Sequence, residues 1–201
     1  EQKPLASDEL KKVKNKVIAI GASTGGIEAI TEIVSKLPVA SPGVVIVQHM
    51  PPMFTTMFAD RLNVKSAMLV KEAEDRDMVL PGRVYVAPGD KQLRIKKTNN
   101  SYSVKITDEK KVCGHRPSVE VLMQSMADVV GSYGIGVMLS GMGRDGANGM
   151  LAMRQEGART IAQDESTCVV YGMPKEAYER GGVEQVMELQ KIAGGILKLL
   201  S

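Results

Sequence analysis

Residues 17–26 read Val-Ile-Ala-Ile-Gly-Ala-Ser-Thr-Gly-Gly, a short aliphatic run that leads directly into a glycine-rich turn. We expect a buried strand over Val17–Ile20, because the run is short and rich in β-branched residues. Apolar positions from Ile27 to Leu37 recur at helical spacing, and this stretch ends before Pro38. A buried strand, a glycine turn and a helix in this order are typical of a parallel α/β sheet.

The same alternation of aliphatic runs and helical stretches continues along the chain. Further strands are expected over Val44–Gln48, Ala67–Val70, Arg83–Ala87, Ile135–Leu139 and Arg159–Gln163. Helices are expected over Met53–Leu62, Ser118–Val130, Ala147–Glu156, Lys175–Arg180 and Leu189–Leu200, with Ser118 as the N-cap of its helix. Runs of Val and Ile that alternate with helices indicate parallel strands buried on both faces.

Residues 93–107 break this rhythm. Leu93–Lys97 and Ser103–Thr107 alternate apolar and polar residues around a Thr-Asn-Asn-Ser turn at 98–101, which is typical of a β-hairpin with one solvated face. The sequence therefore predicts one doubly wound, Rossmann-like α/β domain over 17–201, with a mostly parallel sheet and a β-hairpin insertion. In such folds ligands bind beyond the carboxyl ends of the strands, near the topological switch point.

Composition excludes several classes of protein. Apolar residues make up 43% and charged residues 24% of the 201-residue chain, as in a globular protein rather than a disordered one. No apolar run approaches the ~20 residues that a membrane span needs, so membrane insertion is not expected. Of the net charge of +3, +2 lies in residues 1–16, which hold five Lys and three acidic residues. The remaining chain is almost neutral and poor in aromatic residues, which argues against nucleic-acid binding.

Residues 1–16 are polar and Lys-rich, a composition that suits an interdomain linker. Because the chain also lacks an initiating Met, we expect a fragment of a longer protein, with the linker followed by a catalytic domain over 17–201. Cys113 and Cys168 are no disulfide framework, and unpaired cysteines fit a cytoplasmic location. No cluster of His, Cys or acidic residues has metal-ligand spacing, so we predict neither a metal nor another cofactor.

Three interpretations of the glycine turn at 21–26 are open from its residues alone. It is a dinucleotide-binding turn that brings phosphate to a helix N-terminus, a nucleophile elbow, or a turn that only allows close packing. The dinucleotide pattern fits poorly, because Ser23 replaces its second Gly and Gln48 and His49 stand where an acidic partner is expected. Residues 21–25 fit the elbow pattern G-x-S-x-G in the required strand–turn–helix context.

A serine nucleophile needs a general base, and the chain offers two histidines. His49 ends the second strand, so we expect it at the same edge of the sheet as Ser23, whereas His115 lies in a loop before a helix. For the acid that orients the imidazole, Asp145 lies in a glycine-rich loop after the strand 135–139. The same loop offers backbone N–H groups for an oxyanion site.

These residues also have purely structural interpretations. His49 would then only end a strand, and Asp145 would cap the helix that begins at Ala147. Asp90 and Asp164 also follow strands and are weaker candidates for the acid.

Several motifs, in order from Val17 to the C-terminus, resemble the catalytic domain of the chemotaxis-type protein-glutamate methylesterases, a family of two-domain response regulators. These motifs are Gly21–Gly26, Gln48–Pro51, Leu80–Gly82, Val86–Asp90, His115–Val119, Leu139–Gly146, Ala162–Glu165 and Tyr171–Pro174.

The resemblance implies a catalytic triad of Ser23, His49 and Asp145 that works without a cofactor. It also implies that Thr24 lines the site and that the Met142 backbone N–H helps to form the oxyanion hole. The implied substrates are glutamate methyl esters on the cytoplasmic helices of chemoreceptors, and deamidation of receptor glutamines is an implied second activity. The implied partner, besides the receptor, is an N-terminal receiver domain that restricts access until it is phosphorylated.

A protein of another class remains as the alternative. It is a non-catalytic, Rossmann-like module that binds phosphate or a nucleotide at the helix start formed by Gly25 and Gly26. The lack of an acidic residue after the second strand counts against it.

Overall fold

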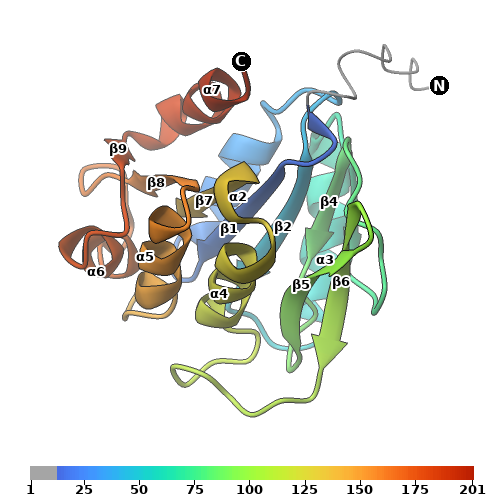
Figure 1. Ribbon diagram of the computed structural model, residues 1–201. Helices are drawn as coiled ribbons and strands as arrows, with labels where there is room; N and C mark the ends of the chain where they lie inside the picture. Colours follow the sequence, from blue (N-terminus) through green and yellow to red (C-terminus); the bar gives the residue numbers. More distant parts are fainter. Residues whose placement is uncertain (1–12) are drawn as a thin grey trace.

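A parallel sheet of seven strands forms the centre of residues 13–201, the part of the chain that the structure describes (Figure 1). The structure is a computed structural model. The strands lie in the order β3-β4-β2-β1-β7-β8-β9, and all neighbours pair in parallel. Their bounds are β1 Val17–Ala22, β2 Gly43–Gln48, β3 Leu69–Glu72, β4 Arg83–Val86, β7 Gly134–Met138, β8 Arg159–Gln163 and β9 Gln185–Met187.

The central strand β1 marks the topological switch point. From β1 the chain first builds one half of the sheet with β2, β3 and β4, and it then returns to the other side of β1 with β7, β8 and β9. The switch point therefore lies between β1 and β7, where a doubly wound fold binds its ligands. Every residue of β1, β2 and β7 is buried, as the continuous aliphatic runs predict.

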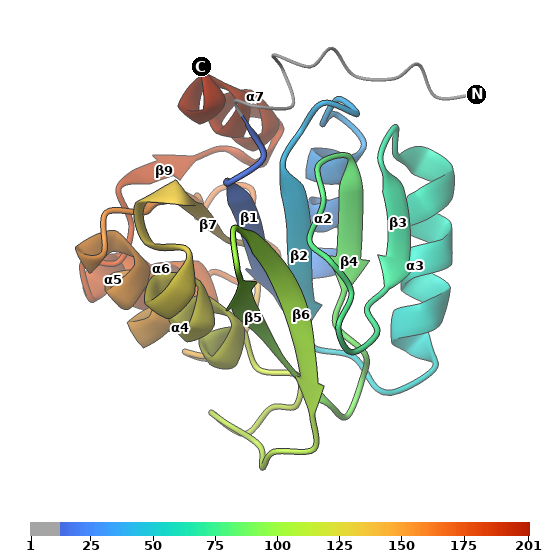
Figure 2. The same ribbon diagram turned by 45° about the vertical axis from the view of Figure 1, so that its right-hand side comes forward.

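Helices cover both faces of the sheet, with α2, α3 and α7 on one face and α4, α5 and α6 on the other (Figures 1 and 2). Their bounds are α2 Gly26–Val34, α3 Phe54–Lys65, α4 Val119–Val129, α5 Ala147–Gln155, α6 Met173–Glu179 and α7 Leu189–Leu200, with a 3-10 turn at Gly131–Tyr133. Within β1, Ile18 and Ile20 pack in the apolar cluster under α2, α3 and α7. Val17 and Ala19 pack in the apolar cluster under α4, α5 and α6. The prediction of a doubly wound α/β fold is confirmed.

The predicted hairpin is confirmed as a separate two-stranded unit, β5 Gln92–Thr98 and β6 Ser101–Thr107 (Figure 2). Asn99 and Asn100 form its two-residue turn, and Asn99 has a left-handed φ of 54°, which Asn tolerates well. The hairpin packs on α4, where the Ile95 N–H donates to the Ser125 hydroxyl at 2.9 Å.

A few elements differ from the predicted ones. Gln185–Met187 forms the short edge strand β9, which the sequence did not predict because these residues contain no aliphatic run. The edge strand β3 begins at Leu69, later than predicted. Helix α6 begins at Met173 rather than at Lys175, because Pro174 is compatible with the first turn of a helix.

Among residues 13–201, no helix combines the length and the apolar character that crossing a bilayer requires. The predicted linker at 1–16 lies mostly outside the described residues. Of its last residues, Val13 is buried, and the Lys16 ammonium donates to the Leu199 carbonyl of α7 at 3.2 Å.

Candidate active site

The carboxyl ends of β1, β2 and β7 bring Ser23, His49 and the loop 140–146 to one edge of the sheet. Strands β1 and β2 pair up to Ala22 and Gln48, and the His49 N–H donates to the Ala22 carbonyl at 3.2 Å. Ser23 and His49 therefore leave two neighbouring strands at the same level. This is the edge at which the sequence predicts the site.

Backbone contacts fix the turn that carries Ser23. Its N–H donates to the Ser140 carbonyl at 3.0 Å, and its carbonyl accepts from Gln48 Nε2 and from the Gly26 N–H, both at 2.8 Å. The loop after β7 approaches so closely that a Cβ on Gly141 would lie 2.9 Å from the Ser23 Cβ. The Ser23 side chain is thus half-buried in a turn whose backbone is tied to both flanking strands.

The glycines of this turn make room for protein side chains. A Cβ on Gly26 would lie 2.1 Å from Gln48 Oε1, and one on Gly25 would lie 2.5 Å from the Val169 Cβ. Gly25 also has a φ of 80°, a conformation that favours glycine. Because Gln48 and Val169 fill the space beside these glycines, the turn lacks the open cradle that a dinucleotide phosphate needs.

His49 is oriented by Asp145. The two side chains lie 2.7 Å apart, Nε2 to Oδ2, and are 9% and 1% exposed. A carboxylate accepts a hydrogen bond, so Nε2 carries the proton and Nδ1 carries the lone pair. Nδ1 is buried and has no hydrogen-bond partner within residues 13–201. An unpaired basic nitrogen at the edge of the sheet that also carries Ser23 is suited to a general base.

The amino end of α4 stabilises the Asp145 carboxylate. It accepts hydrogen bonds from the Ser118 hydroxyl at 2.7 Å, the Val119 N–H at 2.8 Å and the Glu120 N–H at 2.9 Å. Burial by itself raises the pKa of Asp145, but the hydrogen bonds from His49, Ser118 and the two amides outweigh burial and lower it. Asp145 therefore stays ionised, as a helix N-terminus favours.

Of the two helix caps considered from the sequence, Ser118 takes its predicted N-cap position, whereas the alternative in which Asp145 is a cap is wrong. Asp145 does not cap the helix that begins at Ala147: Gly146 occupies that N-cap, and the carboxylate binds the start of α4 instead. Ser118 occupies the N-cap position of α4, but its hydroxyl donates to Asp145 instead of accepting from the helix. The side chains of Asp145 and Ser118 thus join the loop after β7 to the start of α4, and neither caps the helix that follows it in the sequence.

Backbone N–H groups of Thr24 and Met142 are available as donors. Neither has a hydrogen-bond acceptor within the described chain, residues 13–201. The loop around Met142 is held by its neighbours, because the Gly141 N–H donates to Val170 at 3.0 Å and the Gly141 carbonyl accepts from Met173 at 2.8 Å. Two fixed, unpaired N–H groups are what an oxyanion hole requires.

The other candidates from the sequence are engaged elsewhere. The buried Ser140 hydroxyl donates to the Thr24 carbonyl at 2.7 Å and accepts from the Val169 and Val170 amides. The alternative acids also have partners away from His49. Asp90 pairs with Arg116 at 2.9 Å, and Asp164 binds the side chains of Ser166 and Thr167.

The position of His115 was not predicted from the sequence. Its ring is stacked on the His49 ring, with centroids 3.6 Å apart and planes 8° from parallel. No periodicity signals this contact, because His115 lies in an irregular loop. The available signals were that it is the other histidine of the chain and that it begins the motif His115–Val119.

Within the described residues, Cys113, Glu120 and Asp145 place ligand atoms within 4.8 Å of one another. They are a poor metal site, because Asp145 already accepts several hydrogen bonds and burial raises the pKa of the Cys113 thiol.

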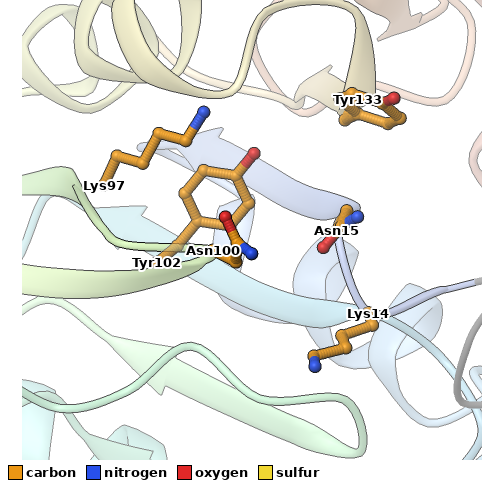
Figure 3. A pocket seen from close by; sticks show the side chains of 6 residues that line it. All are labelled: Lys14, Asn15, Lys97, Asn100, Tyr102 and Tyr133. Carbon is orange, nitrogen blue, oxygen red and sulfur yellow. The ribbon is translucent and has the colours of Figure 1, made fainter.

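A separate cavity of about 260 Å³ lies at the opposite, amino end of the sheet (Figure 3). Its lining residues are Lys14, Asn15, Lys97, Asn100, Tyr102 and Tyr133.

Comparison with known proteins identifies the family of this chain. The family model described as CheB methylesterase matches residues 18–196. The chain belongs to the CheB methylesterase family. The family resemblance noted in the sequence is thereby confirmed.

Individual CheB relatives give the same result. The chain is 52% identical over 198 residues to proteins called protein-glutamate methylesterase/protein-glutamine glutaminase from Salmonella typhi and Escherichia coli. These alignments cover 98% of this chain and 55% of each relative, so the chain spans about half the length of these curated relatives. The crystal structure of the Thermotoga maritima CheB methylesterase catalytic domain matches with a TM-score of 0.89 and 40% identity, over 92% of this chain and 98% of that one.

Proposed function

We propose that this chain is a serine hydrolase that removes methyl groups from glutamate methyl esters of chemoreceptors. The observation that carries the proposal is the His49 imidazole, which Asp145 holds at Nε2 and whose buried Nδ1 has no partner within residues 13–201. Ser23 stands at the end of the neighbouring strand and supplies the hydroxyl. The names of the CheB relatives supply the substrate class.

In the acylation step, the Ser23 oxygen attacks the ester carbonyl carbon while His49 Nδ1 takes the hydroxyl proton. Among residues 13–201 the Ser23 hydroxyl has no hydrogen-bond partner that competes for this proton. Such contacts between nucleophile and base often tighten only when substrate is bound. The ionised Asp145 stabilises the imidazolium that forms, and it keeps the imidazole in the tautomer with its proton on Nε2.

The tetrahedral intermediate places a negative charge on the former carbonyl oxygen. The N–H groups of Thr24 and Met142 would donate to that oxygen, and the amino end of α2 adds a favourable dipole. Removal of one such donor in a hydrolase typically costs about 10²–10³-fold in rate.

The intermediate collapses when the proton on His49 passes to the leaving oxygen, and methanol departs. Water then attacks the acyl-enzyme, with His49 again as the base, and the receptor glutamate is released. Deamidation of receptor glutamines would follow the same route with ammonia as the leaving group. Deamidation is the harder reaction, because the amide nitrogen must be protonated before it leaves.

The proposal also covers partners and location. We propose that methylated cytoplasmic helices of chemoreceptors are the substrate, that a receiver domain precedes this domain in the full-length protein through residues 1–16, and that the protein is cytoplasmic. The match to about half the length of the curated relatives supports the second point. The alternative, a nucleotide-binding module, is disfavoured because side chains fill the space beside Gly25 and Gly26.

A serine-directed fluorophosphonate tests the chemistry. The protein should be labelled at Ser23, and it should release methanol from methylated receptor membranes. Ser23→Ala and His49→Ala should each lower methanol release by orders of magnitude, and the double variant should be little worse, because the pair acts as a unit. Ser132→Ala, an exposed serine at the amino end of β7, is the matched control. A protein that is not labelled and releases no methanol would contradict the proposal.

A further inference from the structure

His115 contacts the proposed base on a side that the triad leaves open. The hydrogen bond to Asp145 holds His49 at the edge of its ring, at Nε2. A single hydrogen bond at one ring atom leaves the imidazole free to tilt about that atom. The His115 ring lies flat on the His49 ring, 3.6 Å away between centroids, and therefore restricts the tilt.

The loop of His115 is itself held firmly. Val112 and His115 exchange two backbone hydrogen bonds, at 3.1 and 2.9 Å. Gln92, a fully buried residue, donates from Nε2 to the His115 carbonyl at 3.1 Å. Its Oε1 accepts from the Ser118 N–H at 2.8 Å, and the Ser118 hydroxyl binds Asp145. The buried Gln92 side chain thus connects the loop of His115, which stacks on His49, to Ser118, which binds Asp145.

The charges around His115 favour a neutral ring. Burial lowers the pKa of His115, and electrostatic interactions with His49 and with Lys111 lower it further, while the Asp145 carboxylate raises it. A neutral ring lies against an imidazolium without charge repulsion. The stack is therefore compatible with both protonation states through which His49 would pass.

We propose that His115 is a positioning residue, which by stacking holds the His49 imidazole in the plane that directs Nδ1 toward Ser23. This inference rests on the proposed function. It assigns His115 no proton transfer and no contact with substrate. The proposed role depends on the flat shape of the His115 ring. Another flat ring should therefore hold His49 in place, whereas a side chain that is not flat should not.

Two variants of His115 separate shape from chemistry. His115→Phe keeps a flat ring, and His115→Leu fills much of the same space without one. We expect His115→Phe to retain most of the wild-type kcat. We expect His115→Leu to lose about 10–100-fold in kcat with little change in KM, because a small misplacement of a reacting group has an effect of this size. His115→Ala should be at least as slow as His115→Leu.

The thermal unfolding of each variant is measured beside its kinetics, so that rates are compared below every melting temperature. Equal rates for His115→Phe and His115→Leu, whether both fast or both slow, would overturn the proposal. Fluorophosphonate labelling separates the two levels of inference. A wild-type protein that is not labelled contradicts the proposed function, whereas equal labelling rates for wild type and His115→Leu contradict only the role of His115.

Discussion

The Ser118 hydroxyl donates to the Asp145 carboxylate at 2.7 Å, although the two residues lie 27 positions apart in the sequence. This contact ties the start of α4 to the loop after β7. It is one of the interactions that keep the carboxylate ionised in a buried place.

Ser118→Ala removes this hydrogen bond and leaves Asp145 buried. Hydrogen bonds to charged groups contribute about 1.5–3 kcal/mol, so the free energy of unfolding should fall by about that amount in chemical denaturation. Methanol release should fall less than in Asp145→Asn, since both amides and His49 still bind the carboxylate. Ser132→Ala should change the unfolding free energy by less than about 0.5 kcal/mol. An unchanged unfolding free energy for Ser118→Ala would show that the contact adds no stability.

Asp145→Asn tests the acid and its ionisation together. The variant should lose activity by about 10⁴-fold, as in other triads whose imidazole loses its tautomer. The stability of the wild-type protein should depend on pH through this carboxylate. Because folding lowers the pKa of Asp145, the carboxylate stabilises the protein above about pH 4, and this contribution disappears as pH falls through the folded pKa.

The difference in unfolding free energy between wild type and Asp145→Asn should therefore be large at pH 7 and shrink in acid. Denaturation at several pH values measures it. A difference that stays constant with pH would contradict the ionised state of Asp145, and near-normal activity would make Asp145 a structural residue only.

His115 should make stability fall as the solution becomes mildly acidic. Folding lowers its pKa, so below about pH 6.5 the unfolded chain binds a proton that the folded protein does not. Stability then falls as pH drops from that value through the folded pKa. His115→Phe lacks this titrating group, so its unfolding free energy should change less with pH over the same range. Parallel pH curves for the two proteins would refute this expectation.

Gly141→Ala should damage both the fold and the site. An added Cβ would lie 2.3 Å from Met173 Sδ and 2.9 Å from the Ser23 Cβ, so the loop after β7 must move. We expect a loss of about 1–3 kcal/mol, typical of overpacking, and slower methanol release. Gly194→Ala is the matched control. Its Cβ would meet open space inside α7, so it should stabilise the protein by up to about 1 kcal/mol. A harmless Gly141→Ala would mean that this close approach is not required.

The proposed receiver domain should act on access rather than on chemistry. The 201-residue chain should hydrolyse methylated receptors constitutively, and a protein that also carries the unphosphorylated receiver domain should be slower, chiefly through weaker productive binding. Rates on the same receptor membranes, with a small fluorogenic ester as a control for the chemical step, measure this. If the protein with the receiver domain is as fast as the 201-residue chain, occlusion is refuted and the triad proposal is unaffected.

Local patterns in the sequence were enough for the class of fold and for the edge that carries the site. The aliphatic runs at Val17–Ile20 and Val44–Gln48 predict buried strands, because a strand buried on both faces is apolar along most of its length. The elbow pattern around Ser23, and His49 at the end of the next strand, follow from the same patterns. The turn of the hairpin at 98–101 was likewise visible in its Asn pair.

Only the tertiary structure decided which partners these side chains have. Asp145 is adjacent to one helix in sequence but binds the amino end of another, and His115 leaves an irregular loop to stack on His49. Such contacts join segments far apart in the chain, so they depend on strand order and loop path rather than on local periodicity. Periodicity records how much of each segment is buried, whereas the partner of a buried polar group depends on which donors the packed fold brings within hydrogen-bond distance.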